Sequence, residues 1–525
     1  MNDLERDGLP RAAVPLGLDP RAVTRPGAPG LSDAGMLGRR PTAAVVGGGI
    51  AGLTAATALA ERGVDVTVFE REDHLGGRVG GWSERLPDGT AVTMSRGFHA
   101  FFRQYYNLRA LLKRTDPRLE RLAPLSDYPL LDAQGRTDTF AGLPRTPPWN
   151  AVAFAWRSPT FTPRDFLRLK GREALPLATV SVPETYERLD GVDAASFLEA
   201  INFPAAARHL AFEVFSRSFF ADPRDLSAAE LATMFHLYFL GSSEGLVFDV
   251  PTDPFPQALW DPLAGYLVAR RTDIRTGVAV TALHREPGGF AIETDDGTAH
   301  FDAAVLACDV TGLRQIVAAS PSVGSATWRG DIAALRTAPP FLVRRLWLDR
   351  PVDAARPPFL GTGSVPPLDN ISLLDRYEGE ARRWAARTGG SVVELHAYAA
   401  TPDDSLAKAV DARLHEIYPE SRNAHVVGEI TLWREDCPLF GVGDFARRPT
   451  VETPDAALAL AGDGIRIDLP VALMERAAAT GWAAANVLLR RWGLEGHPLR
   501  SVPNRGRIGL LNRLAASKRP RPAPG

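Results

Sequence analysis

The sequence is poor in cysteine and lysine and has no long apolar run. Cys308 and Cys437 are the two cysteines among 525 residues, too few by themselves for a disulfide framework or a metal centre, and they fit a reducing compartment. No apolar stretch approaches the roughly 18 residues that a membrane-spanning helix needs. Lys and Arg total 60 against 62 Asp and Glu, so no nucleic-acid partner is indicated. The length favours two or more domains.

Both ends of the chain differ from its middle. Residues 1–40 are rich in Pro, Gly and Arg, which predicts a disordered leader. Its last two residues, Arg39-Arg40, imitate a twin-arginine export signal, but the motif that follows explains the next stretch better. Residues 491–525 form a basic tail with a few apolar residues. This tail is either solvated or docked on an anionic membrane, which would make the protein cytoplasmic and peripheral on the inner face of the membrane.

A strand, a glycine-rich turn and a helix follow the leader. In "TAAVVGGGIAGLTAATALAERGVDVTVFE", Gly47, Gly49 and Gly52 stand in G-x-G-x-x-G order, and the next strand closes on Glu70. Gly47 permits the tight turn, Gly49 lets the backbone approach a pyrophosphate, and Gly52 lets helix and strand pack closely. The helix N-terminus can hold phosphate, and Glu70 can accept hydrogen bonds from a ribose. The stretch predicts a Rossmann-like dinucleotide site.

Two further segments favour FAD over NAD. Gly76, Gly77 and Arg78 make a second glycine turn with a cation, suited to phosphate or flavin contacts. Near the other end, "LALAGDGIRIDLPVALMERAAATGWAAANVLL" predicts a strand, then Gly462-Asp463, then a helix. An acid after a strand can bind a ribityl hydroxyl, and a helix N-terminus can face the flavin edge where reduction places negative charge.

Together these motifs resemble the flavin amine oxidase and carotenoid desaturase superfamily. The resemblance implies an α/β fold: a Rossmann-like, glutathione-reductase-type FAD-binding domain with a discontinuous α+β substrate-binding domain. The FAD domain would comprise residues 41–115, 255–315 and 455–490, and the substrate domain residues 116–254 and 316–454. The β-meander in "DIRTGVAVTALHREPGGFAIETDDGTAHFDAAVLACD" places Val280 on the adenine side. The expected FAD contacts are Gly47, Gly49, Ile50, Ala51, Gly52, Glu70, Arg71, Gly76, Gly77, Arg78, Gly97, Phe98, Val280, Gly462, Asp463, Leu473 and Met474.

Four further stretches resemble one branch of this superfamily, the carotenoid φ-ring synthases or isorenieratene synthases. They are "SRGFHAFFRQYYNLRALLKRTDP", "PRTPPWN", "RSPTFTPRDFLRL" and "SFFADPRDLSAAEL". The resemblance implies that the chain desaturates the β-ring end groups of a carotenoid such as β-carotene and moves one geminal methyl, which makes the ring aromatic. The final electron acceptor, a quinone or O2, stays open.

The first of these stretches carries an aromatic stripe. Five aromatic side chains recur there at the three-and-four spacing of a helical face, which predicts a helix. Ordinary core packing is the plain interpretation. Our hypothesis is that the stripe meets the carotenoid ring beside the flavin, where aromatic faces stabilise a carbocation. The stripe is Phe98, Phe101, Phe102, Tyr105 and Tyr106, of which the first four are the expected substrate contacts.

His99, Arg96 and Asp468 are the catalytic candidates. His99 is the favoured base, because a neutral imidazole can take a proton near pH 7. Arg96 lies close to the presumed flavin face in the sequence. Asp468 precedes the flavin-facing helix and could instead support its N-terminus. His236 and Glu244 are rivals, and each of these residues has an alternative, purely structural role.

Three other functions remain open. Another FAD-dependent carotene desaturase or isomerase would share every motif above. A flavin amine oxidase is weaker, because those enzymes place a lysine near the flavin, and the four lysines here, Lys113, Lys170, Lys408 and Lys518, lie outside the expected strand around "FLVRRLWLDR". A prenyl-lipid escort protein without flavin chemistry is disfavoured by the intact Glu70 and Gly462-Asp463.

Overall fold

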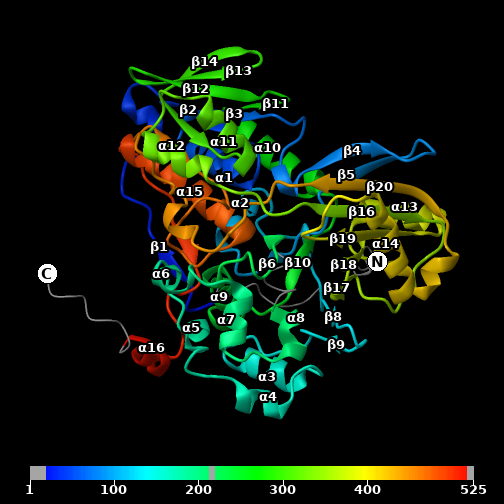
Figure 1. Cartoon of the computed structure of the whole chain (residues 1–525). Helices are drawn as coiled ribbons and strands as arrows, with labels where there is room; N and C mark the ends of the chain where they lie inside the picture. Colours follow the sequence, from blue (N-terminus) through cyan, green and yellow to red (C-terminus); the bar gives the residue numbers. More distant parts are fainter. Residues whose placement is uncertain (1–18, 212–218, 517–525) are drawn as a thin grey trace.

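A five-stranded parallel sheet organises the upper part of the molecule in Figure 1. The computed structural model describes residues 19–211 and 219–516. The sheet order is β11 (Asp273–Thr276), β3 (Asp65–Glu70), β2 (Thr42–Val46), β15 (Ala303–Leu306) and β21 (Leu458–Leu460). Every neighbouring pair is parallel. The expected α/β, Rossmann-like fold class is therefore confirmed.

Helix α1 (Ile50–Ala60) is buried along its whole length between this sheet and helix α15 (Leu473–Arg491). Its sequence, "IAGLTAATALA", combines small residues of high helix propensity with two threonines whose hydroxyls donate to carbonyls one turn back. Gly481 allows the close crossing, because a Cβ there would lie 2.4 Å from the carbonyl oxygen of Ala51. This packing directs the N-termini of both helices to the same edge of the sheet.

We call the half of the molecule that contains the parallel sheet the FAD half, because the sequence predicts that it binds FAD. The rest of this half consists of connections and an added antiparallel sheet. Strands β12 (Val280–Glu286), β13 (Gly289–Thr294) and β14 (Gly297–Phe301) form the expected meander. The other elements are β4 (Gly81–Arg85), β5 (Ala91–Ser95), α2 (Tyr106–Leu112), η8 (Pro256–Trp260), α10 (Asp261–Val268), α11 (Val310–Ala318) and α12 (Ala326–Ala333).

A seven-stranded sheet forms the other half, at the right of Figure 1. Its order is β20 (Val426–Arg434), β16 (Phe341–Leu348), β19 (Ser391–Ala397), β18 (Leu368–Leu373), β17 (Phe359–Val365), β8 (Leu130–Leu131) and β9 (Thr137–Asp138). Helices α13 (Gly379–Thr388) and α14 (Asp404–Ile417) pack on it. A helical lobe lies below in Figure 1: α3 (Trp149–Arg157), α4 (Pro163–Arg168), α5 (Leu175–Ala178), α6 (Glu184–Leu189), α7 (Ala194–Ala200), α8 (Arg208–Ala211), α9 (Ala228–Phe235) and η7 (His236–Leu240).

The aromatic stripe is not a helix, so that prediction is wrong. Phe101 and Phe102 form a short strand, β6, which pairs with β10 (Phe248–Pro251), and α2 begins only at Tyr106. Strand β10 also pairs with β7 (Leu122–Pro124), so a small sheet takes over residues whose spacing alone suits a helix. Tertiary pairing overrides the local pattern here.

The two chain ends are also more ordered than expected. Residues 19–40 include strand β1 (Val23–Arg25), which pairs with β22 (Leu499–Ser501) in the tail, so the prediction of a disordered leader is wrong for this part. Residues 1–18 lie outside the described part. Arg507 forms a buried ion pair with Asp19, and helix α16 (Gly509–Ala516) follows. The tail is therefore not simply solvated: up to Arg507 it belongs to the fold.

These contacts predict how truncation affects stability. Removing residues 497–525 eliminates β22 and the hydrogen bond from His497 to the Ala58 carbonyl, and it should lower the thermal midpoint by about 5 °C or more. Removing only residues 509–525 leaves those contacts in place and should change the midpoint by less than about 2 °C. Differential scanning calorimetry checks both; equal midpoints for the two truncations would contradict the assignment.

Candidate active site

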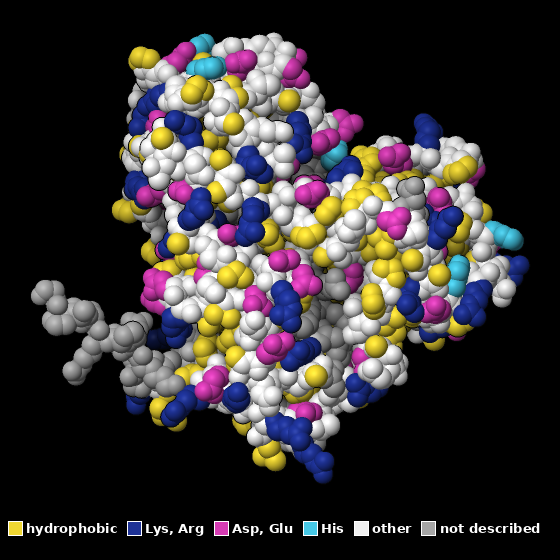
Figure 2. Space-filling view, in the orientation of Figure 1, with side chains coloured by type: hydrophobic (Ala, Val, Ile, Leu, Met, Phe, Trp, Pro, Cys, Tyr) yellow, Lys and Arg dark blue, Asp and Glu magenta, His cyan; other side chains and the backbone are white. Residues whose placement is uncertain are grey.

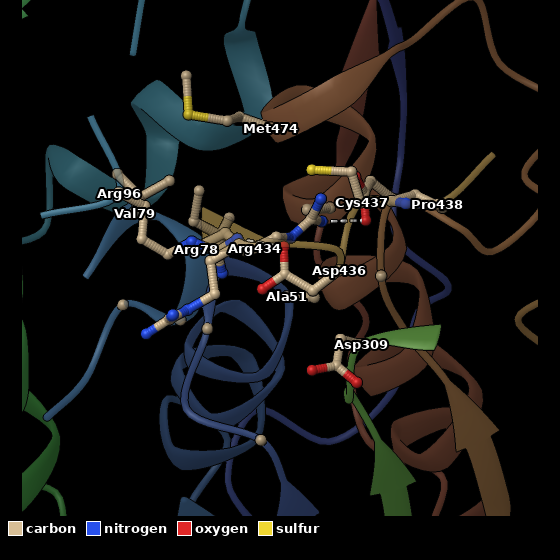
Figure 3. Close-up of a pocket in the computed structure, with 18 of the residues that line it drawn as sticks. Ala51, Arg78, Val79, Arg96, Asp309, Arg434, Asp436, Cys437, Pro438 and Met474 are labelled. Carbon is tan, nitrogen blue, oxygen red and sulfur yellow. Dashed lines mark hydrogen bonds and ion pairs between the residues drawn. The ribbon is translucent and has the colours of Figure 1, made fainter. Parts of the chain in front are cut away.

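A continuous cavity of about 1170 Å³ lies where the carboxyl edge of the parallel sheet faces the seven-stranded sheet. Small-molecule sites usually measure roughly 300–1,000 Å³, so this one has room for a large cofactor and part of a second ligand. Figure 3 shows Met474 near the top of the view and Asp309 lower down, with Arg78 and Asp436 between them and Arg96 at the left.

The glycine turn after β2 forms one wall of the cavity. Gly47 has a φ of +111°, and a Cβ on Gly52 would lie 1.8 Å from the Gly47 carbonyl oxygen, so both positions need glycine for the fold itself. Gly49 differs, because the nearest protein atom to a Cβ there is 3.8 Å away. Gly49 lines the cavity at the N-terminus of α1, which has no side-chain cap, so its free N–H groups are available to phosphate.

Glu70 and the second glycine turn complete this wall. The carboxylate of Glu70 accepts hydrogen bonds from the N–H groups of Gly48 (2.6 Å) and Glu72 (2.9 Å), and burial raises its pKa. The Gly76 N–H donates to the Gly48 carbonyl at 2.9 Å, which holds the two turns side by side. The sequence motifs therefore meet in space as a nucleotide cradle.

Buried ion pairs neutralise the charges along the cavity. Arg78 pairs with Asp463; burial alone would lower the pKa of the arginine, but the carboxylate outweighs it and the pKa rises well above its ordinary value. Arg96 pairs with Asp436, which lies in the segment after β20. The Arg96–Asp436 pair joins the FAD half to the segment after the seven-stranded sheet, whereas the Arg78–Asp463 pair lies within the FAD half.

The opposite end of the cavity is aromatic. We call Phe98, Phe102, Tyr128, Phe248 and Phe359 the aromatic wall; all five line the cavity. The Phe98 and Phe359 rings lie 4.4 Å apart, and Phe248 lies 5.4 Å from both Phe98 and Phe102. Such packing suits an apolar, conjugated ligand.

Most of the expected contacts line the cavity. They are Gly47, Gly49, Ile50, Ala51, Glu70, Arg71, Gly76, Gly77, Arg78, Arg96, Phe98, His99, Phe102, Tyr105, Val280, Gly462, Asp463, Leu473 and Met474. Gly52 and Phe101 lie behind the wall. Gly97 instead packs on His396, whose Nε2 would be 2.4 Å from a Cβ at that position.

Of the catalytic candidates, His99 and Arg96 line the cavity and Asp468 does not. His99 lines the cavity and its Nδ1 donates to the Gly97 carbonyl at 2.8 Å, which leaves Nε2 as the basic nitrogen. Burial lowers the pKa of His99 to about 4, and Arg96 acts in the same direction, so the ring is neutral but weakly basic at pH 7. Asp468 is half exposed, pairs with Arg466 and does not line the cavity. Helix α15 has Ala472 as its N-cap, so the expectation that Asp468 supports that helix is wrong.

The rivals lie elsewhere. His236 is buried and contacts the Pro503 carbonyl at 2.7 Å. Glu244 accepts hydrogen bonds from the Asp19 N–H and the Tyr106 hydroxyl. Neither lines the large cavity.

Sequence reasoning missed the contribution of the seven-stranded sheet. Phe359, Asp369, Asn370, Tyr398 and Cys437 line the cavity but belong to no motif. Only the alternation of polar residues in "VVELHAYAA" could have indicated that one face of β19 carries function.

Comparison with known proteins agrees with this geometry. A family model described as flavin containing amine oxidoreductase matches residues 50–489. The chain belongs to the flavin-containing amine oxidoreductases. As a family member with an intact dinucleotide cradle, it is an FAD-dependent oxidoreductase.

Individual relatives show which members of the family this chain resembles. The chain is 59% identical over 504 residues to the carotenoid φ-ring synthase of Streptomyces griseus, which covers 95% of this chain and 97% of that protein. It is 28% identical to the carotenoid φ-ring synthase of Chlorobaculum tepidum, over 88% of this chain and 91% of that protein. A putrescine oxidase structure superposes with a TM-score of 0.64 at 15% identity over 86% of this chain and 99% of that one, a likeness of fold.

The two glycines of the turn give a sharp test of the cradle. Gly49→Val should leave the protein folded but without FAD, because the added Cβ lies at the cavity and comes no closer than 3.8 Å to a protein atom. Gly52→Ala should destabilise the protein whether or not FAD is present, because its Cβ collides with the turn. Flavin absorbance per protein and thermal midpoints of the stripped proteins separate the effects; normal FAD content in Gly49→Val would overturn the cradle assignment.

Proposed function

We propose that the protein converts the β-ring end groups of a carotenoid to aromatic rings by desaturation with migration of one geminal methyl. The observation that carries the proposal is the continuity of the FAD cradle with the aromatic wall in one cavity. A carotenoid end group in that cavity would lie beside the flavin and be enclosed by aromatic faces. The identity to the φ-ring synthase of Streptomyces griseus supports the same substrate class.

The residues present fit FAD. The cradle offers the α1 N-terminus to the pyrophosphate and Glu70 to a ribose, and Asp463 stands at the end of β21 where a ribityl chain can be reached. Bound FAD supplies the oxidation, by accepting a hydride from a ring carbon. Two such oxidations and the methyl shift convert one β-ring to an aromatic ring.

The protein's own contribution is to protect a carbocation. Hydride loss leaves positive charge on the ring, and methyl migration requires that charge to survive. The faces of Phe98, Phe102 and Phe248 can stabilise it by about 0.5–2 kcal/mol for each well-placed ring, without bonding to it. The wall also excludes water, which would otherwise add to the cation and give an alcohol.

Two alternatives are less well supported. In the described residues, no lysine lines the cavity, although amine oxidases place one near the flavin. A carotene desaturase or isomerase without methyl migration would use the same cavity, and only the product distinguishes it.

Expression in cells that accumulate β-carotene tests the proposal. We expect products that have lost four hydrogen atoms from each converted ring but retain every carbon, with the trimethylphenyl pattern of a φ-ring in the NMR spectrum. A cell line that expresses Gly49→Val is the matched control. Desaturated products that keep both geminal methyls would refute ring aromatisation.

We also propose that the protein binds a membrane surface, through the helical lobe rather than through the tail alone. Among the described residues no helix is long and apolar enough to span a bilayer. Helices α3 and α4, however, expose Trp156 (83%) and Leu167 (87%) beside Arg157 and Arg164. Figure 2 shows such apolar and basic side chains interspersed at the lower end, where Figure 1 places α3, α4 and, further to the left, α16. Exposed aromatic and basic groups together suit an anionic interface.

Vesicle sedimentation tests this surface. Replacing Trp156 and Leu167 by Glu should reduce binding to vesicles with about 30% anionic lipid by at least about tenfold. The replacement removes exposed apolar area and adds negative charge that the anionic lipid repels. Val268→Glu is the control, since Val268 is 60% exposed on α10, in the FAD half. Equal loss in the control, or no loss in the double variant, would contradict the assignment.

A further inference from the structure

Four polar side chains are linked by an ion pair and hydrogen bonds into one network that runs from the protein interior to the cavity. Arg345 on β16 pairs with Glu394 on β19 at 2.6 Å. Glu394 Oε1 lies 2.9 Å from His396 Nε2, and His396 Nδ1 lies 2.7 Å from the Tyr398 hydroxyl. Tyr398 lines the cavity.

The chemistry of these groups fixes the direction of the hydrogen bonds. Burial alone would raise the pKa of Glu394, but Arg345 and His396 outweigh it and hold the pKa at about 2, so the group is a carboxylate. A carboxylate only accepts, so His396 Nε2 carries a proton and donates it to Glu394. His396 Nδ1 is then the acceptor, and the Tyr398 hydroxyl donates to it.

These four side chains are held in place by further contacts. Arg345 also donates to the Thr93 carbonyl at 2.7 Å and to the Ser95 hydroxyl at 2.9 Å, which anchors it to β5. His396 is 2% exposed and fills the space that a side chain on Gly97 would need. The Asn370 amide donates to the Tyr398 oxygen at 2.9 Å. On the cavity side, the Tyr398 ring packs 4.6 Å from the ring of Phe220.

We propose that Tyr398 and His396 form the proton relay of each desaturation, an inference that rests on the proposed function. Once the ring has lost a hydride, which FAD would accept, the neighbouring ring C–H bond breaks and its electron pair forms the new double bond. The released proton passes to the Tyr398 oxygen while the original phenolic proton moves to His396 Nδ1. Tyr398 thus stays neutral, and the positive imidazole is stabilised by Glu394. Tyr398 is the catalytic residue, and His396 and Glu394 act through it.

This arrangement serves the reaction better than His99. The bond from His99 to a backbone carbonyl supplies no negative charge to stabilise a second proton, whereas the carboxylate of Glu394 lies beside His396.

The first test compares two Tyr→Phe variants of the FAD-loaded enzyme. Tyr398→Phe should lower hydrogen loss from β-carotene by at least about 100-fold, because general acid–base catalysis typically contributes 10²–10⁴-fold. Tyr418→Phe is the matched control, a buried tyrosine that does not line the cavity. Activity of Tyr398→Phe within about threefold of the parent, at equal FAD content, would overturn the relay.

The second test remains decisive if Tyr398→Phe folds poorly. His396→Gly should regain activity with added imidazole but not with pyrazole, which has the same shape and is a far weaker base. Equal rescue by both would show that the ring only fills space. The rate of hydrogen loss tests the relay, whereas the structure of the product tests the proposed function. A parent enzyme that desaturates the ring without moving a methyl would therefore refute the proposed function but not the relay.

Discussion

The structure depends on one constraint: charged side chains buried in its interior must be neutralised where they stand. An unpaired buried charge costs several kcal/mol, whereas a paired and hydrogen-bonded one is tolerated. Glu230 is fully buried and lies between Arg448 (2.9 Å) and Arg476 (2.8 Å). Because Glu230 comes from α9 and Arg476 from α15, this triad fixes the helical lobe against the FAD half. The Arg78–Asp463 and Arg345–Glu394 pairs follow the same rule.

The cavity itself has two chemical regions. At the cradle, backbone N–H groups and a few paired charges face the position of the nucleotide. At the aromatic wall, the rings offer weak, diffuse stabilisation to a cation without forming a bond to it. The polar chain through Glu394 and His396 reaches that region only as the neutral hydroxyl of Tyr398. With FAD bound, a hydride acceptor, the aromatic wall and the proposed proton acceptor would share one cavity.

The cradle was predictable from the sequence because the residues that form it are close together in the chain. Gly47, Gly49 and Gly52 act within one turn, and Glu70 follows at the end of the adjacent strand, so spacing alone specifies the site. The aromatic stripe was not predictable in the same way, because pairing with β10 decided its conformation. The ordered chain ends depend on the β1–β22 pairing, between residues more than 450 positions apart, which no local pattern reveals. Glu394, His396 and Tyr398 alternate along one strand face, but their chemistry emerges only when Arg345 and the cavity are placed beside them.

The central claim is that the cavity protects a ring cation from water until the methyl has moved. Turnover of β-carotene by the FAD-loaded enzyme in water enriched in oxygen-18, followed by mass spectrometry of all carotenoid products, tests this most directly. We expect aromatic products that carry no oxygen-18, with hydroxylated carotenoids appearing only when the aromatic wall is opened, as in Phe102→Ser. Abundant oxygen-18-labelled ring alcohols from the unmodified enzyme would contradict it.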